Sequence, residues 1–454
     1  MNSISNDIVT LINSEIAWNY KIVPIEKFEN QLRILVQKDG NYQDKLRELS
    51  VLLNYKIIPE FAEESELILL LRKYYRRNEN STDYKLSNAS DTEFLINLIQ
   101  EAKSLNSSDI HLEIYEERCR IRLRIDGRLI ERHVLDKENY FSIVNKIKIQ
   151  ANLDITEKRL PQDGRIKIES EQGKMDLRVS TLPGYYGEKV VVRILGSDAS
   201  FLNIKDLGFT NDQLRKYSQN INKSRGIILV SGPTGSGKTT TLYASLKELN
   251  TPDRNILTIE DPIEYTLQGI NQTQLKDSIG YGFASALRTF LRQDPDIIMV
   301  GEIRDEETAQ IAIRSALTGH LVLSTIHTND AIGIITRLID LGIPEFLISS
   351  TVNLAIAQRL VRKLCTHCKK RTDEKNEQFI PCGCPECHYT GYSGRLAIYE
   401  IIEVNATLVQ AVSQGMDSLG VSTLFNVDNL KTQAETLLKQ GITSYEEICT
   451  IVDF

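Results

Sequence analysis

A glycine-rich segment in the second half of the chain has the residue types needed to hold a nucleotide. Residues 232–239 are Gly-Pro-Thr-Gly-Ser-Gly-Lys-Thr, which match the G-x-x-x-x-G-K-[ST] pattern of a phosphate-binding loop. The segment follows the apolar run Ile227–Ser231 and opens the helical run Thr239–Glu248. That strand–loop–helix context separates a phosphate loop from a glycine-rich structural turn, which is the alternative interpretation. The pattern predicts binding of Mg-ATP.

Position within this loop predicts what each residue does. Backbone N–H groups and the helix N-terminus attract the phosphates. Lys238 is expected to reach the β- and γ-phosphates, and Thr239 is expected to bind Mg²⁺. The residues expected to contact the nucleotide are Gly232, Pro233, Thr234, Gly235, Ser236, Gly237, Lys238, Thr239 and Thr240.

Polar side chains follow each of three further apolar segments that are predicted to be strands, at residues 256–259, 297–300 and 321–325. Ligands of parallel sheets bind at this carboxyl edge. Hydrolysis needs a carboxylate that orients or deprotonates water, and Mg²⁺ needs a further acidic partner. Solvated surface acids are the alternative, so the spacing alone leaves several candidates. The acids are Glu260, Asp261, Glu264 and Glu302, and the third strand end carries His327.

Two pairs of arginines could stabilise the charge that develops during phosphoryl transfer. Arg288 and Arg292 lie four residues apart in a helical run, whereas Arg178 and Arg193 lie on predicted strands of a different part of the chain. Solvated or salt-bridged arginines are the alternative, with a stability contribution of only ~0–1 kcal/mol. Spacing does not choose between the two pairs.

Five of the seven cysteines lie between residues 365 and 387. Cys365-x-x-Cys368 and Cys384-x-x-Cys387 are separated by fifteen residues, as in four-thiolate zinc sites. Free cytosolic thiols are the alternative. Cys382 could replace Cys384, and His367 and His388 are weaker alternatives. Because Cys384 completes a two-residue knuckle, the predicted Zn²⁺ ligands are Cys365, Cys368, Cys384 and Cys387.

Length and composition indicate a soluble, multidomain protein. The chain has 454 residues, of which 41% are hydrophobic and 25% charged, so two or three domains are expected. Its net charge of −7 argues against a motor that binds nucleic acid through phosphate neutralisation. Cysteines grouped in one segment favour metal binding in a cytosolic protein over disulfides.

Membrane insertion is not expected. Residues 1–7 lack the basic segment and apolar core of a secretory signal, and no stretch approaches ~18 uninterrupted apolar residues. The most apolar long window, Leu341–Val361, contains Glu345, Asn353, Gln358 and Arg359 and is interpreted as a packed helix. We expect a cytoplasmic protein whose membrane contact comes through a partner.

The hydrophobic patterns predict an α/β fold with several parts. Apolar strands at 227–230, 256–259, 297–300 and 321–325 alternate with helical lengths, which is typical of a RecA-like parallel sheet. The hairpin turn Asp126-Gly127 and neighbouring strands favour an α+β, PAS-like middle domain with mostly antiparallel strands and two helices. The expected boundaries are 1–76 for a small N-terminal domain, 77–90 for a linker, 91–196 for the middle domain and 197–454 for the ATPase domain, with a zinc-binding insertion at 360–395.

Taken together, these segments resemble the assembly ATPases of bacterial type II secretion systems and type IV pili, over essentially the whole chain. The resemblance implies homohexameric rings that hydrolyse ATP at the cytoplasmic face of the inner membrane and drive the extension of a pilin-like filament. It also implies two partners, an inner-membrane platform protein and the cytoplasmic docking domain of a membrane assembly protein. The N-terminal domain resembles the family's partner-docking domain in a short form. The segments that carry the resemblance are 108–111, 160–165, 187–194, 291–296, 318–330 and 391–395.

The same resemblance assigns roles that spacing leaves open. Glu264 falls on the family's catalytic glutamate, and Glu302 stands at the Walker B acid that helps organise Mg²⁺. Arg178 and Arg193 match arginines that reach the nucleotide from the middle domain, and His327 lies in the family's histidine box. These five residues are the predicted catalytic set.

Three other functions compete with filament assembly. A retraction ATPase shares the motor core, but such enzymes generally lack the N-terminal docking domain and the cysteine insertion. A RecA-like nucleic-acid translocase conflicts with the acidic balance. A nucleotide-gated scaffold without turnover is disfavoured because Lys238, Thr239, Glu264 and Glu302 are all present. The sequence does not distinguish a secretion system from a pilus system.

Overall fold

The computed structural model divides the chain into two compact units. One unit comprises residues 1–88 and 363–393, and the other comprises residues 89–362 and 394–454. The predicted linker, residues 77–90, lies outside the described residues. The structure describes residues 4, 8, 11–12, 14–28, 31–37, 42–53, 55–64, 67, 70–71, 74–75, 91–170, 173–195, 203–372, 379–416, 418–425 and 428–452.

The N-terminal part contains a small α/β layer. Strand β2 pairs antiparallel with β1 and parallel with β3, so the order of the sheet is β1-β2-β3. The elements are α2 (Ser14–Tyr20), β1 (Ile22–Phe28), β2 (Gln31–Val36), α3 (Tyr42–Leu53) and β3 (Lys56–Phe61).

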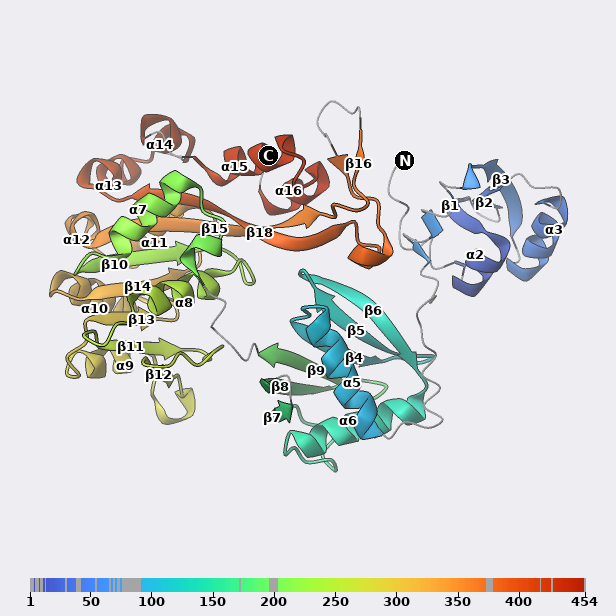
Figure 1. Ribbon diagram of the computed structural model, residues 1–454, viewed down its shortest axis with the longest axis horizontal. Coiled ribbons are helices and arrows are strands. Elements are labelled where there is room, and N and C mark those ends of the chain that lie inside the picture. Colours follow the sequence, from blue (N-terminus) through green and yellow to red (C-terminus); the bar gives the residue numbers. More distant parts are fainter. Residues whose placement is uncertain are drawn as a thin grey trace. The chain divides into compact units, whose positions relative to one another are not determined.

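A six-stranded antiparallel sheet with two helices follows (Figure 1). Its strand order is β6-β5-β4-β9-β8-β7, and the predicted hairpin turn joins β5 to β6. Asp126 and Gly127 have φ angles of 47° and 83°, the positive values that a type I′ turn requires. The elements are α5 (Asp91–Ser104), β4 (Asp109–Ile114), β5 (Cys119–Ile125), β6 (Arg128–Leu135), α6 (Lys137–Gln150), β7 (Gln162–Ser170), β8 (Gly173–Pro183) and β9 (Glu188–Leu195).

The phosphate-loop region contains a seven-stranded sheet of order β12-β11-β13-β14-β10-β15-β18 (Figure 1). The four strands expected from the sequence are confirmed as β10, β11, β13 and β14, and β13 and β10 both pair parallel with β14. The strands are β10 (Gly226–Ser231), β11 (Ile256–Glu260), β12 (Asn271–Gln274), β13 (Ile297–Val300), β14 (Leu321–Ile326), β15 (Val352–Leu364) and β18 (Tyr392–Glu403).

Helices cover both faces of this sheet, which explains its continuous apolar strands. Ile228 and Val230 of β10 pack with α7 and α8, whereas Ile227 and Leu229 pack with helices α9 to α16 on the other face. The carboxyl ends of the parallel strands therefore form one polar edge above a dry core. The helices are α7 (Asn211–Ile221), α8 (Lys238–Leu249), α9 (Phe283–Phe290), α10 (Glu306–Leu317), α11 (Ala331–Asp340), α12 (Glu345–Thr351), α13 (Ala406–Ser413), α14 (Ser418–Phe425), α15 (Leu430–Lys439) and α16 (Tyr445–Ile451).

The interpretation of Leu341–Val361 as a packed helix is wrong for most of its length. The helix α12 ends at Thr351, and the chain continues as strand β15 beside β10. Most residues of β15 are buried, so its sequence shows an apolar run without the alternation of an exposed strand. Such a run does not distinguish a buried strand from a buried helix.

No helix within the described residues is long and apolar enough to span a membrane.

Candidate nucleotide and metal sites

The phosphate loop connects β10 to α8 through three glycines in conformations that L-residues avoid. Gly232, Gly235 and Gly237 have φ angles of 146°, 81° and 89°. A side chain at Gly232 would also lie 2.5 Å from the carbonyl oxygen of Gln358, and one at Gly237 would lie 2.8 Å from the Gln358 amide nitrogen. The loop is thus packed directly on β15, and only glycine fits these positions.

Lys238 and Ser236 point their polar groups at the loop itself. The Lys238 ammonium donates to the carbonyl oxygens of Gly232 and Pro233 at 2.7 and 3.1 Å. Burial lowers the pKa of Lys238, and the nearby Glu302 carboxylate opposes that shift. The Ser236 hydroxyl is buried and has no hydrogen-bond partner in the described part of the chain. A lysine and a hydroxyl held inside a glycine cradle suit an anion such as a triphosphate.

Glu302 and His327 meet at the carboxyl edge of the sheet, as the sequence predicts. Glu302 follows β13, and His327 follows β14. The His327 Nε2 atom lies 3.3 Å from a Glu302 oxygen, and Arg304 forms an ion pair with the same carboxylate. Arg304 also lies 3.8 Å from Asp261, so it connects two of the candidate acids. Because Arg304 lies beside both carboxylates and His327 also contacts Glu302, neither Glu302 nor Asp261 is well suited to accept a proton from water.

Glu264 differs from the other three candidate acids. Its carboxylate makes no hydrogen bond or ion pair among the described residues, whereas Glu260 is buried and accepts three hydrogen bonds. Glu264 lies in the turn after β11, and its backbone N–H donates to the Tyr243 hydroxyl at 3.3 Å. A carboxylate that accepts no hydrogen bond from the described residues can accept one from water. Glu264 is therefore the acid best suited to orient an attacking water.

Arg178 and Arg193 belong to a row of like charges on the middle sheet. Arg165, Arg178 and Arg193 stand directly opposite one another on β7, β8 and β9. The Arg178 guanidinium donates to the carbonyl oxygen of Ile263, beside Glu264, at 2.7 Å. Arg193 is 55% exposed and pairs with Asp109 at 3.0 Å. Neither Arg178 nor Arg193 forms a hydrogen bond with residues 232–240 in the described part of the chain.

The arginine row faces an open cavity of about 500 Å³ that Gln274 also lines. Like charges placed directly opposite on a sheet repel one another, and burial lowers the pKa of Arg178. Two residues further along the same two strands, Lys167 stands opposite Asp176, which is the usual pairing of opposite charges. A row of three cations, of which Arg193 is paired with Asp109, favours a polyanion as its ligand. Arg165 was not among the residues selected from the sequence. The available signal was that Arg165 and Lys167 lie two residues apart on β7, which places two cationic side chains on the same face of the strand.

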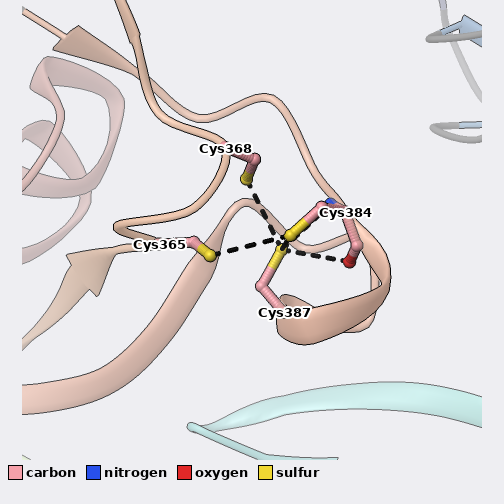
Figure 2. A group of neighbouring side chains, drawn as sticks. All are labelled: Cys365, Cys368, Cys384 and Cys387. Carbon is pink, nitrogen blue, oxygen red and sulfur yellow. Dashed lines mark hydrogen bonds between the residues drawn. The ribbon is translucent and has the colours of Figure 1, made fainter.

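Four cysteines that the sequence selected form a compact cluster (Figure 2). The Sγ atoms of Cys365, Cys368, Cys384 and Cys387 all lie within 4.8 Å of one another. Three sulfur–sulfur distances are 3.8, 3.7 and 3.7 Å, close to the ~3.8 Å edge of a tetrahedron with Zn–S bonds of ~2.3 Å. Cys382 is not part of the cluster, and its sulfur lies 3.9 Å from the Ile380 carbonyl oxygen.

Backbone N–H groups point at two of these sulfur atoms. Gly383 donates to Cys368 at 3.2 Å and Gly391 donates to Cys387 at 3.3 Å, as suits thiolates more than thiols. Gly391 has a φ angle of 80°, and a side chain there would lie 2.4 Å from Pro381. The backbone conformation at Gly391 and the N–H groups that donate to the sulfur atoms therefore fit a tetrahedral metal ion held by the two cysteine knuckles.

Glu400 is a buried acid beside the phosphate-loop edge that the sequence reasoning did not select. It lies on β18, is 3% exposed and accepts the Ala331 backbone N–H at 3.2 Å. Burial, with a contribution from Asp330, raises the pKa of Glu400 to about 7. Because this pKa is higher than in the unfolded chain, the stability that Glu400 contributes is present below the unfolded value of ~4.3 and is lost as the pH rises through about 7.

Replacing Glu400 with a neutral group should remove this pH dependence. We expect Glu400→Gln to raise the stability of the unit that contains β18 relative to the natural chain by roughly 2 kcal/mol more at about pH 8.5 than at about pH 5.5. Urea unfolding at both pH values measures the difference, and Glu345→Gln, at an exposed glutamate, is the matched control. A stability difference that stays constant with pH would contradict the buried, titrating carboxyl.

Comparison with known proteins gives a consistent set of similarities. Residues 86–450 match the family described as "Type II/IV secretion system protein". The chain is 46% identical to the putative type II secretion system protein E of Escherichia coli (strain K12), over 79% of this chain and 76% of that protein. It is 39% identical to the type IV pilus assembly ATPase PilB of Myxococcus xanthus, over 97% of this chain and 86% of that protein.

A solved structure shares the fold as well. The pilus retraction motor PilT with bound ADP aligns with a TM-score of 0.54 and 27% sequence identity. The match covers 79% of this chain and 97% of PilT, so about a fifth of this chain has no counterpart there.

Proposed function

The chain belongs to the type II/IV secretion system protein family, and from this premise we propose that it is a motor that hydrolyses ATP to drive assembly of a pseudopilus or pilus. The observation that carries the proposal is the phosphate loop with Lys238 and Ser236 inside it, at the same sheet edge as Glu302, His327 and Glu264. The names of its E. coli and M. xanthus relatives supply the coupled process.

The described residues support a division of labour in the reaction. Lys238 would release the loop carbonyls and bind the β- and γ-phosphates, and Thr239 would hold Mg²⁺, whose charge would offset that of the phosphates. The Glu264 carboxylate orients water and takes its proton as the water oxygen bonds to the γ-phosphorus. The bond to the ADP oxygen breaks at the same time, so that ADP and phosphate leave. Arg178 and Arg193 stabilise the charge on the transferred group.

The cysteine cluster is proposed to hold one structural Zn²⁺. Four sulfur atoms at tetrahedral spacing leave no open position, which is the mark of a structural site. We also propose that the working form is a homohexamer, recruited from the cytoplasm to the inner membrane by a platform protein and by a docking domain bound to the N-terminal part.

Assembly is favoured over retraction by sequence identity, because the chain is 39% identical to PilB of M. xanthus and 27% identical to PilT. PilB of M. xanthus aligns with 97% of this chain, whereas PilT aligns with 79%.

Deletion of the gene for this protein should remove the filaments that it is proposed to assemble. In the host organism, a deletion is expected to abolish surface or secretion filaments, because extension needs ATP hydrolysis. The natural chain should restore them, and Lys238→Ala should not. Electron microscopy of filaments in the three strains makes the measurement. An excess of filaments in the deletion strain would instead identify a retraction motor.

A further inference from the structure

A cluster of buried polar groups lies beneath the turn that carries Glu264, and the proposed chemistry does not use it. Its members are Tyr243, Thr258, Glu260 and Gln272, from helix α8 and strands β11 and β12. Tyr243 is fully buried and Glu260 is 3% exposed. Burying a carboxyl and a phenol costs free energy unless both are hydrogen-bonded, so their arrangement needs an explanation.

Glu260 is the centre of this cluster. It accepts hydrogen bonds from the Thr258 hydroxyl at 2.6 Å, from the Gln272 amide at 3.1 Å and from the Tyr243 hydroxyl. Gln272 donates again to the Tyr265 carbonyl at 2.9 Å and accepts the Leu267 N–H at 2.6 Å. The cluster thus fixes the segment just after Glu264 to the sheet.

The Tyr243 hydroxyl connects this cluster to Glu264. Since its proton is donated to Glu260, its oxygen is left as an acceptor. That oxygen receives the backbone N–H of Glu264 at 3.3 Å. Tyr243 stands on α8, the helix whose first residue is Lys238. One side chain therefore ties the backbone of the proposed base to the helix that begins at the phosphate loop.

We propose that Tyr243, oriented by Glu260, is a positioning residue that fixes the Glu264 carboxylate at a set place relative to the phosphate loop. The inference rests on the proposed role of Glu264. A hydrogen bond of this kind does not touch the nucleotide, so it should affect the chemical step and leave binding unchanged. Misplacement of a reacting group by ~1 Å can slow a reaction by ~10²-fold.

Tyr243→Phe is the direct test, because phenylalanine retains the ring that packs in the core and removes only the hydroxyl. We expect kcat for ATP hydrolysis to fall about tenfold while KM for Mg-ATP stays within about twofold. Tyr217→Phe is the matched control. Tyr217 is also fully buried and shares a hydrogen bond with Ser245 of the same helix, but its hydroxyl forms no hydrogen bond with the Glu264 turn among the described residues. It should lower thermal stability without lowering kcat.

A double-mutant cycle separates positioning from a general structural defect. If Tyr243 acts through the Glu264 carboxylate, then Tyr243→Phe should lower kcat in the natural chain and have no further effect in a Glu264→Gln background. Equal effects in both backgrounds, or normal kcat in Tyr243→Phe, would overturn the inference. Normal kcat in Glu264→Gln alone would overturn the proposed base, which is a distinguishable result.

Glu260→Gln provides a second variant if Tyr243→Phe does not fold. Glutamine keeps the shape of the side chain but is a weaker acceptor for the Tyr243 hydroxyl. We expect kcat to fall about threefold, with KM for Mg-ATP again within about twofold, and with no additional loss in the Glu264→Gln background. A Glu260→Gln chain that binds Mg-ATP normally and retains full kcat would count against the positioning role.

Discussion

Glu264→Gln is expected to lower kcat for ATP hydrolysis by at least ~100-fold, since a positioned general base contributes ~10²–10⁴ in rate. Glutamine has nearly the same shape, so it should leave the turn after β11 and the Tyr243 contact in place. The phosphate loop and Lys238 are untouched, so the dissociation constant for Mg-ATP should change by less than about threefold. Steady-state phosphate release and equilibrium binding of a fluorescent ATP analogue measure the two quantities.

A matched charge change shows whether the effect is local. Glu248→Gln removes one exposed negative charge from α8 without touching the sheet edge, and it should leave kcat unchanged. Equal turnover in the natural chain and in Glu264→Gln would remove this glutamate from the reaction. Asp261 and Glu302 would then be the remaining candidates, although Arg304 lies beside both.

The parts of this protein that could be predicted from sequence are those with short-range signals. The phosphate loop is specified by eight consecutive residues between an apolar strand and a helix, and three of its glycines have the positive φ angles that the motif requires. The strands β10, β11, β13 and β14 are covered on both faces and show as unbroken apolar runs. The cysteine pairs have the fixed spacing of metal knuckles.

Apolar segments that are buried on both faces could not be assigned to strand or helix from the sequence alone. Residues 352–361 are mostly buried within β15, so they show no two-residue alternation and were interpreted as helix. The deciding information is long-range, because β15 is a strand by virtue of its pairing with β10. Local propensity does not carry that information.

The residues that support the site also could not be identified from the sequence, because long-range structure brings them together. Glu260 was one of four candidate acids until the fold showed its carboxylate buried against Tyr243 and Thr258. Tyr243 comes seventeen residues before Glu260 on a different element, and no motif joins them. Arg165 joins Arg178 and Arg193 only through strand register. Register and helix packing, which single sequences do not reveal, decide which polar residues meet.

The second large effect is expected at the cysteine cluster. Cys384→Ser should lower bound zinc from about one equivalent per chain to a small fraction, because serine does not supply a thiolate. Structural zinc contributes ~10–16 kcal/mol in small peptides, and the segment from Cys365 to Cys387 has few buried apolar residues of its own. We therefore expect the knuckles to unfold locally and to become sensitive to protease. Metal analysis by mass spectrometry and limited proteolysis measure the two effects.

Cys382→Ser is the matched control, since its sulfur lies outside the cluster, 3.9 Å from the Ile380 carbonyl oxygen. It removes a thiol from the same segment and should retain the full zinc content and protease resistance. Equal zinc in both variants would show that Cys384 is not a ligand.

Loss of the metal should first destabilise the amino end of β18, the strand that carries the buried Glu400, because Cys384 and Cys387 lie on the knuckle that leads into this strand. Faster amide hydrogen exchange in β18 of Cys384→Ser, with unchanged exchange in β10, would support that order.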